Sequence, residues 1–136
     1  MAQAGFNKHY LFLKKNTVVI KHHGGKHLRA KPGNLEEADP DGGHGEFAQW
    51  EADPEKGNKI RLKSHKSGKY LRIVGGDKVD VGGVGGKFCV FKYHKDGDHV
   101  KLESCEFGGK YIAVGKDNKV RVGVGGPFCK LEIFRK

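Results

Sequence analysis

The sequence predicts an all-β domain, a β-trefoil in which three four-stranded repeats surround a pseudo-threefold axis. Three observations predict this fold: one segment occurs three times, the copies are evenly spaced, and apolar and polar residues alternate within each copy. Repeats of roughly 20 to 50 residues indicate units that cannot bury their apolar faces alone and must share one core. Three such units closed into a barrel satisfy this requirement and remove exposed sheet edges. A propeller fits less well, because propellers usually have about four or more blades.

The repeat is clearest in its first half. Residues 59–75 read KIRLKSHKSGKYLRIVG, and residues 99–115 read HVKLESCEFGGKYIAVG. With one inserted residue they align as apolar-x-Leu-x-Ser, then Gly-Lys-Tyr, then an apolar alternation. Residues 18–30, VVIKHHGGKHLRA, form a weaker third copy in which His27 takes the place of the tyrosine.

The second half of each repeat contains a glycine followed two residues later by phenylalanine. These phenylalanines, Phe47, Phe88 and Phe128, are 41 and 40 residues apart. We therefore assign the whole chain, residues 1–136, to one domain with repeats at about 17–58, 59–98 and 99–136. Large residues recur at equivalent positions, which predicts a layer of the core formed by Phe47, Phe88, Phe128, Trp50, Phe91 and Leu131.

Each repeat reads as short strands joined by glycine-rich turns. Ile60 and Leu62 alternate with basic residues, a pattern that buries one face of a strand and exposes the other. Glycine pairs follow several of these segments, and we expect positive φ angles at Gly75-Gly76, Gly82-Gly83 and Gly108-Gly109. Before the repeats, the segment Tyr10-Leu11-Phe12-Leu13 is expected to close the barrel or pack against it.

Composition narrows the functional class. The chain has no run of 18 apolar residues and no apolar signal-peptide core, and its cysteines number three. An odd, sparse cysteine count indicates free thiols in a reducing compartment, so we expect a cytoplasmic protein. The formal net charge of +10 favours acidic partners: acidic filaments, anionic lipid surfaces, sulfated sugars or nucleic acid. No nucleic-acid-binding motif is present, so specific nucleic-acid binding is not expected.

The repeat motif resembles a known group of trefoils. KIRLKSHKSGKYLRI, followed by a short Val-rich strand and then Phe-x-x-aromatic, is similar to the repeats of fascin-like and hisactophilin-like proteins. The similarity is best over residues 59–136 and weaker over 17–58. It implies cytoplasmic actin binding, in some members with attachment to an anionic membrane surface.

Basic residues cluster in the first two repeats but not in the third. We expect this surface to bind actin filaments or another acidic polymer through Lys21, His22, Lys26, Arg29, Lys63, Lys66, Lys69 and Arg72. Unit three carries Glu103, Cys105 and Glu106 in the corresponding stretch, so the basic surface is asymmetric. A solvated lysine-rich face explains the same residues equally well.

A carbohydrate-binding trefoil, a lectin, is the alternative. Its sites would lie in the glycine-rich loops and use backbone groups together with Asp41, His44, Asp80 and Lys87. The Gln-x-Trp signature of ricin-type lectins is absent, since Gln49 directly precedes Trp50. The simplest interpretation of the loops themselves is a tight connection between two strands.

No arrangement for catalysis or metal binding stands out. The cysteines have no base at a fixed spacing, and no Ser-His-Asp or paired-carboxylate motif occurs. His22, His23, His44 and His65 lack the spacing of a zinc site. We therefore expect a binding protein that is not an enzyme, with no cofactor and no metal.

Overall fold

The computed structural model describes residues 15–75 and 77–136. These residues form twelve β-strands and three short 3-10 helices, and no α-helix occurs among them. No helix in the described part of the chain is long and apolar enough to cross a membrane. The predicted packing of Tyr10-Leu11-Phe12-Leu13 lies outside the described residues.

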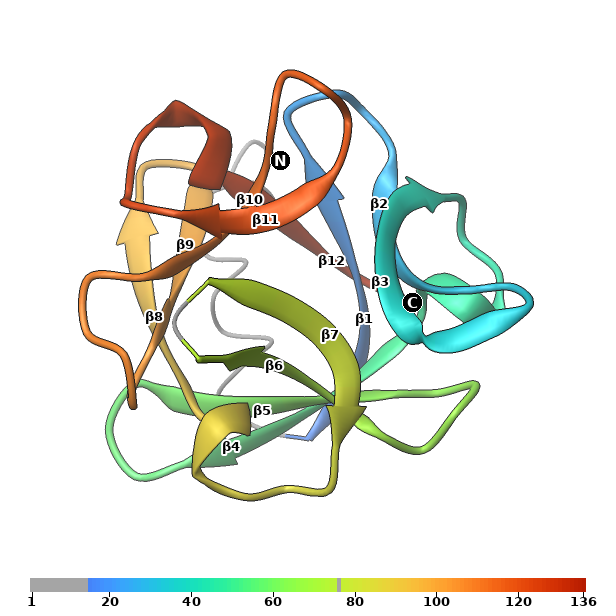
Figure 1. The fold of residues 1–136 in the computed structure, drawn as a ribbon, viewed down its shortest axis with the longest axis horizontal. Coiled ribbons are helices and arrows are strands. Elements are labelled where there is room, and N and C mark those ends of the chain that lie inside the picture. The colour runs from blue at the N-terminus through green and yellow to red at the C-terminus, as the bar shows by residue number, and fades with distance from the viewer. Residues whose placement is uncertain (1–14, 76) are drawn as a thin grey trace.

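Six strands form a closed barrel (Figure 1). They are β1 (Asn16–His22), β4 (Trp50–Glu55), β5 (Lys59–Ser64), β8 (Phe91–Asp96), β9 (His99–Ser104) and β12 (Leu131–Arg135). Each strand pairs antiparallel with the next in the series β1, β4, β5, β8, β9, β12, and β12 pairs with β1. The ring of backbone hydrogen bonds is thus complete and leaves no barrel edge unpaired.

The other six strands form three hairpins. They are β2 (His27–Lys31) with β3 (Asn34–Gly42), β6 (Tyr70–Val74) with β7 (Lys78–Gly83), and β10 (Tyr111–Val114) with β11 (Val120–Gly123). Strands β3, β7 and β11 surround the centre of the view in Figure 1, and β3 also pairs with β7. The architecture is that of a β-trefoil, as the internal repeat predicted.

The core lies inside the barrel and under the hairpins, where the three repeats contribute equivalent apolar residues. Trp50, Phe91 and Leu131, which begin strands β4, β8 and β12, are fully buried. The Trp50 indole N–H donates to the Leu28 carbonyl at 3.1 Å, so burial leaves no unsatisfied donor on this ring. The alternating residues Ile60 and Leu62 are also fully buried, which confirms the sequence pattern.

The predicted core layer is wrong for the three repeated phenylalanines. Phe47, Phe88 and Phe128 occupy the middle position of the 3-10 helices η3 (Glu46–Ala48), η4 (Lys87–Cys89) and η5 (Pro127–Cys129). Their positions are equivalent, but Phe47 and Phe88 are only half-buried and Phe128 is 40% exposed. The residue that follows each phenylalanine points into the core instead, and these residues are Ala48, Cys89 and Cys129. A 3-10 turn places consecutive side chains in different directions, so identity at equivalent positions does not imply burial.

The expectation of positive φ is wrong for Gly82-Gly83, because both residues lie in strand β7. Gly75 and Gly109 do have positive φ angles, of 66° and 82°. The three thiols are unpaired: those of Cys89 and Cys129 are buried, and that of Cys105 is exposed.

Candidate functional site

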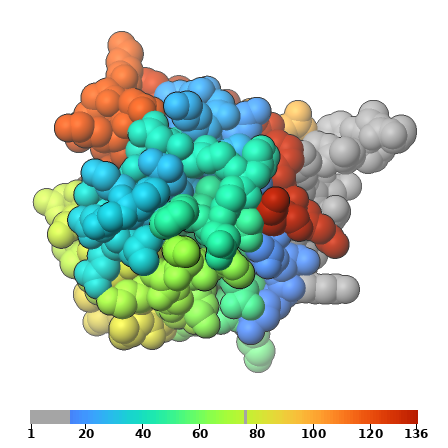
Figure 2. Space-filling model, turned by 90° about the vertical axis from the view of Figure 1, so that its right-hand side faces the viewer, coloured from blue at the N-terminus to red at the C-terminus, as the bar shows by residue number. Residues whose placement is uncertain are grey.

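The structure places the predicted basic residues on four strands, β1, β2, β5 and β6, and on two separate loops. Lys26 lies in the loop between β1 and β2, whereas Lys66 and Lys69 lie in the loop between β5 and β6. In Figures 1 and 2 the β2–β3 hairpin (cyan) separates the first loop (blue) from the second (light green). The eight residues therefore do not form one continuous surface.

Several of the predicted basic side chains already have acidic partners. The Arg29 guanidinium donates to both carboxylate oxygens of Asp39, at 2.9 and 3.2 Å, and both side chains are largely buried. Arg72 and Asp80 form the equivalent pair in the second repeat, and this hydrogen bond raises the pKa of the arginine. These two pairs hold the β2–β3 and β6–β7 hairpins together, so their charges are largely compensated within the protein.

Three more members of the predicted set are constrained in other ways. Lys69 forms an ion pair with Glu36, and Lys21 approaches Glu132 at 3.9 Å. His22 is only 3% exposed, and its ring nitrogens contact Pro40 O and the backbone N–H of Gly24. Among the described residues, Lys26, Lys63 and Lys66 have no ion pair, although Lys66 lies over the Phe47 ring at 5.2 Å.

The predicted sugar-binding residues are also split. Lys87 pairs with Glu106 and lies over the Phe88 ring, and the His44 ring packs on His27. Both residues are exposed: Lys87 is the first residue of η4, and His44 lies in the loop that leads into η3. Asp41 and Asp80 belong instead to strands β3 and β7, next to the axis between the three hairpins.

At this axis the hairpins enclose a hollow of about 420 Å³, which we call the axial hollow. All three repeats contribute to it, from β2 and β3, from β7, and from the turn into β11. Ala38, Val79 and Val120 supply its apolar lining. Six polar residues also line it: Lys31, Glu37, Asp39, Asp41, Asn118 and Lys119. A second hollow, of about 360 Å³, shares Glu37 and Val79 with it and reaches Asp80.

One contact between repeats and two contacts within the first repeat orient the polar groups of the axial hollow. The Asn118 side-chain amide donates to the Asp41 carboxylate at 3.0 Å, which connects the third repeat to the first. The backbone N–H of Asp41 donates to Asp39 at 2.8 Å, so the Arg29–Asp39 pair also orients this segment. Lys31 pairs with Glu37 at 3.6 Å, and Lys119 has no ion pair among the described residues. Carboxylates, an amide and ammonium groups thus surround an apolar lining.

Sequence reasoning did not identify Asn118, Lys31, Lys119 or Glu37. One signal was present: Asn118 has a positive φ of 59° in a turn, a conformation that asparagine tolerates better than most residues. Its side chain could only be placed beside Asp41 once the three hairpins were known to meet. No group of three or more His, Cys, Asp or Glu side chains in the described part of the chain is arranged to hold a metal ion.

Comparison with known proteins supports the fold. No protein-family model matches the chain, and no curated protein matches its sequence. The designed threefold-symmetric protein ThreeFoil superimposes with a TM-score of 0.73 at 19% identity, covering 88% of this chain and 99% of that one. A GlcNAcα1-4Gal-releasing endo-β-galactosidase from Clostridium perfringens superimposes with a TM-score of 0.77 at 16% identity, covering 89% of this chain and 32% of that one. At such identities the likeness concerns the fold alone, which is the β-trefoil.

Proposed function

We propose that this β-trefoil is a carbohydrate-binding module and that its ligand occupies the axial hollow. The observation that carries the proposal is the bridge between Asp41 and Asn118, which places a carboxylate and an amide beside an apolar lining. A carboxylate accepts hydrogen bonds from hydroxyl groups, and an amide both donates and accepts them. Ala38, Val79 and Val120 provide apolar surface for the C–H face of a sugar ring.

The size of the hollow and one structural neighbour support this proposal. Ligand sites commonly have volumes of about 300 to 1,000 Å³ with a few convergent polar groups, and the axial hollow lies within that range at about 420 Å³. The neighbour from Clostridium perfringens is, by its name, an enzyme that acts on a sugar chain, and this chain matches about a third of it. The proposed role here is binding without catalysis.

A glycan array tests the proposal. We expect selective retention of a small set of glycans by the wild-type protein, at an ionic strength high enough to suppress general attraction to its positive charge. A glycan that is retained should also bind about tenfold more weakly when Asn118 is replaced by glycine. Retention of only sulfated glycans in proportion to their charge, or of none, would contradict the proposal.

Binding to an acidic polymer such as the actin filament is the second candidate. The net charge of +10 favours it, as do Lys26, Lys63 and Lys66, which form no ion pair with another residue that the structure describes. Lys63 and Lys66 lie on β5 and the loop that follows it, and Lys26 lies on the separate loop between β1 and β2, which argues for contact through one of these areas at a time. The cytoplasm is the compartment that we propose for either function, because three unpaired thiols fit a reducing environment. Cosedimentation with actin filaments distinguishes the two candidates.

A further inference from the structure

One charged pair on the barrel is reversed relative to the equivalent pairs of the other two repeats. In the first repeat Glu51 on β4 lies opposite Lys63 on β5, and Glu132 on β12 lies opposite Lys21 on β1 in the same way. The third equivalent pair consists of Lys92 on β8 and Glu103 on β9. The barrel strand β8 therefore carries a cation where β4 and β12 carry carboxylates.

This reversal places two lysines side by side. Lys92 is directly opposite Lys59 on the neighbouring strand β5, whereas the equivalent neighbour of Glu51 is Thr17. Opposed residues on antiparallel strands have β-carbons about 5 Å apart, and like charges at that separation destabilise the sheet. Neither lysine forms an ion pair with another described residue.

Glu103, the nearest carboxylate, is engaged elsewhere. One of its oxygens accepts from His94 Nε2 at 2.7 Å, and the other accepts from the backbone N–H of Gly109 at 2.7 Å. The Gly109 hydrogen bond and then the His94 hydrogen bond keep the pKa of this carboxyl below its usual value. Glu103 is thus held as an anion by its own partners. It lies opposite Lys92 and lines the same hollow, and Glu55 on β4 lies opposite Lys59, but these carboxylates form their ion pairs with His94 and Arg61.

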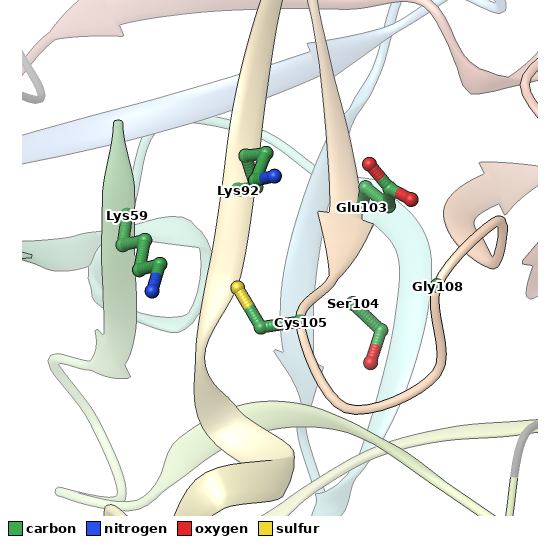
Figure 3. A pocket seen from close by; sticks show the side chains of 6 residues that line it. All are labelled: Lys59, Lys92, Glu103, Ser104, Cys105 and Gly108. Atoms are coloured by element: carbon green, nitrogen blue, oxygen red, sulfur yellow. The ribbon is translucent and has the colours of Figure 1, made fainter. Parts of the chain in front are cut away.

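The lysines line a hollow of about 190 Å³, which we call the Lys59–Lys92 pocket. Figure 3 shows Lys59 and Lys92 on adjacent strands, with Cys105 directed toward the space between them. Glu103, Ser104 and Gly108 also line the pocket. The Ser104 oxygen points away from the two lysines in Figure 3 and accepts the N–H of Phe107 at 2.9 Å. A water molecule occupies about 30 Å³, so the volume suffices for one tetrahedral oxyanion.

We propose that the Lys59–Lys92 pocket binds a phosphate or sulfate group, either as the free anion or as an ester on a larger ligand. The oxyanion supplies the negative charge that Glu51 and Glu132 provide at the equivalent positions. It also accepts hydrogen bonds from the two ammonium groups. The pocket lies on the side of the barrel, away from the axial hollow, so this site does not depend on the proposed sugar site.

The test is titration calorimetry at low ionic strength with inorganic phosphate, inorganic sulfate, glucose 6-phosphate and uncharged glucose. The double variant Lys59→Thr with Lys92→Gln should raise the Kd for phosphate by about tenfold, because it removes two cationic contacts. The matched control, Lys26→Gln with Lys116→Gln, loses the same net charge from two distant loops and should stay within about twofold of the wild type. A tighter Kd for glucose 6-phosphate than for phosphate would identify an ester as the ligand, and equal values would identify the free anion.

Alkylation of Cys105 gives a second, local readout. Uncharged iodoacetamide should modify this exposed thiol, and phosphate should slow the reaction with a midpoint at the calorimetric Kd. The single variant Lys59→Thr, which copies Thr17 of the first repeat, keeps the test valid if the double variant does not fold. Absence of phosphate and sulfate binding by the wild type would overturn the proposal. Equal loss of affinity in the control variant would also overturn it, since general surface charge would then explain the binding.

Discussion

Gly83 on β7 and Cys89 on η4 approach each other so closely that a β-carbon on Gly83 would collide with the Cys89 sulfur. The same relationship recurs in the other repeats. A β-carbon on Gly123 would lie 2.7 Å from Cys129 Sγ, and one on Gly42 would lie 2.9 Å from the Ala48 β-carbon. These glycines lie in strands and do not have positive φ angles, so no turn requires them. They are required because each hairpin packs closely against its 3-10 helix.

Replacing Gly83 with alanine should destabilise the protein by about 1 to 3 kcal/mol, the usual range for overpacking a well-filled core. The new methyl group would also meet the Tyr70 carbonyl oxygen at 3.0 Å, so it cannot move away from the sulfur freely. Urea denaturation followed by circular dichroism measures the loss. Adding Cys89→Ala should restore part of the stability, because alanine occupies the equivalent position in the first repeat.

Gly86→Ala is the control for this prediction. A β-carbon there meets nothing within 4 Å, and the φ of −79° suits any residue. Its free energy of unfolding should stay within about 0.5 kcal/mol of the wild type. If both alanine variants lost the same stability, the contact with Cys89 would not be the cause.

The fold could be predicted because the apolar alternation and the repeat spacing constrain the same structure. Ile60 and Leu62 were assigned to the core correctly, since strand geometry alone sends alternate residues inward. Phe128 was assigned there wrongly, because the direction of a side chain in a 3-10 turn depends on how that turn packs. Gly83 was assigned to a turn for a related reason. The sequence shows a glycine there, but it does not show that the Cys89 sulfur fills the space that a β-carbon would need.

The candidate sites were harder to predict, because each depends on contacts between distant segments. Asp41 was proposed as a ligand, yet its partner Asn118 is 77 residues away in the sequence. The opposition of Lys59 and Lys92 follows from the register of β5 and β8, which no local pattern reveals. Likewise, Arg29 was expected to bind an acidic polymer, and the structure shows that Asp39 already compensates its charge.

His22 should make the stability of the protein depend on pH. Burial lowers its pKa in the folded protein, and Gly24 N–H donates to its Nδ1, which must therefore be unprotonated. In the unfolded chain a histidine titrates near pH 6.5. The stability that neutral His22 contributes is therefore fully present above about pH 6.5. It declines as the pH falls, because the unfolded chain takes up the proton at a higher pH than the folded protein does.

This dependence is measured as the free energy of unfolding at about pH 7.5 and about pH 5.5, on either side of the unfolded pKa and above most carboxylate titrations. His22→Gln should show a smaller difference between the two values than the wild type. His27 retains some dependence in that variant, since burial also lowers its pKa. The exposed His65 provides the control, and His65→Gln should leave the difference unchanged. An unaltered difference in His22→Gln would show that its burial does not govern the pH response.

The positions of Lys26, Lys63 and Lys66 lead to a prediction about binding to acidic filaments. Lys63→Glu with Lys66→Glu changes one strand and the loop that follows it, whereas Lys26→Glu with Lys66→Glu makes the same charge change on two separate loops. Each exposed contact contributes only about 0.2 to 1 kcal/mol, so adjacent changes are needed to abolish one contact area. Cosedimentation with actin filaments at two salt concentrations should show the larger loss for the first variant. No sedimentation of the wild type at low salt would exclude this partner.

Replacing Asn118 should weaken sugar binding in the axial hollow without changing the stability of the hairpins that surround it. The positive φ of 59° at this position suits glycine, and the backbone N–H of Asn118 donates to the Gly115 carbonyl at 2.9 Å whatever the side chain. Asn118→Gly should therefore keep the turn and the free energy of unfolding, yet remove the amide that holds Asp41.

We expect Asn118→Gly to weaken glycan binding by about tenfold, which corresponds to the loss of one or two hydrogen bonds to the sugar. Calorimetry with the glycan selected on the array measures this change. Lys116→Gln, in the same turn but outside the axial hollow, is the matched control and should bind as the wild type does. Asn118→Asp should weaken binding further, since a second carboxylate beside Asp41 repels the Asp41 carboxylate and pushes the two side chains apart. Unchanged affinity in both Asn118 variants would place the sugar elsewhere, and the glycine-rich loops around His44 and Lys87 would be the next sites to test.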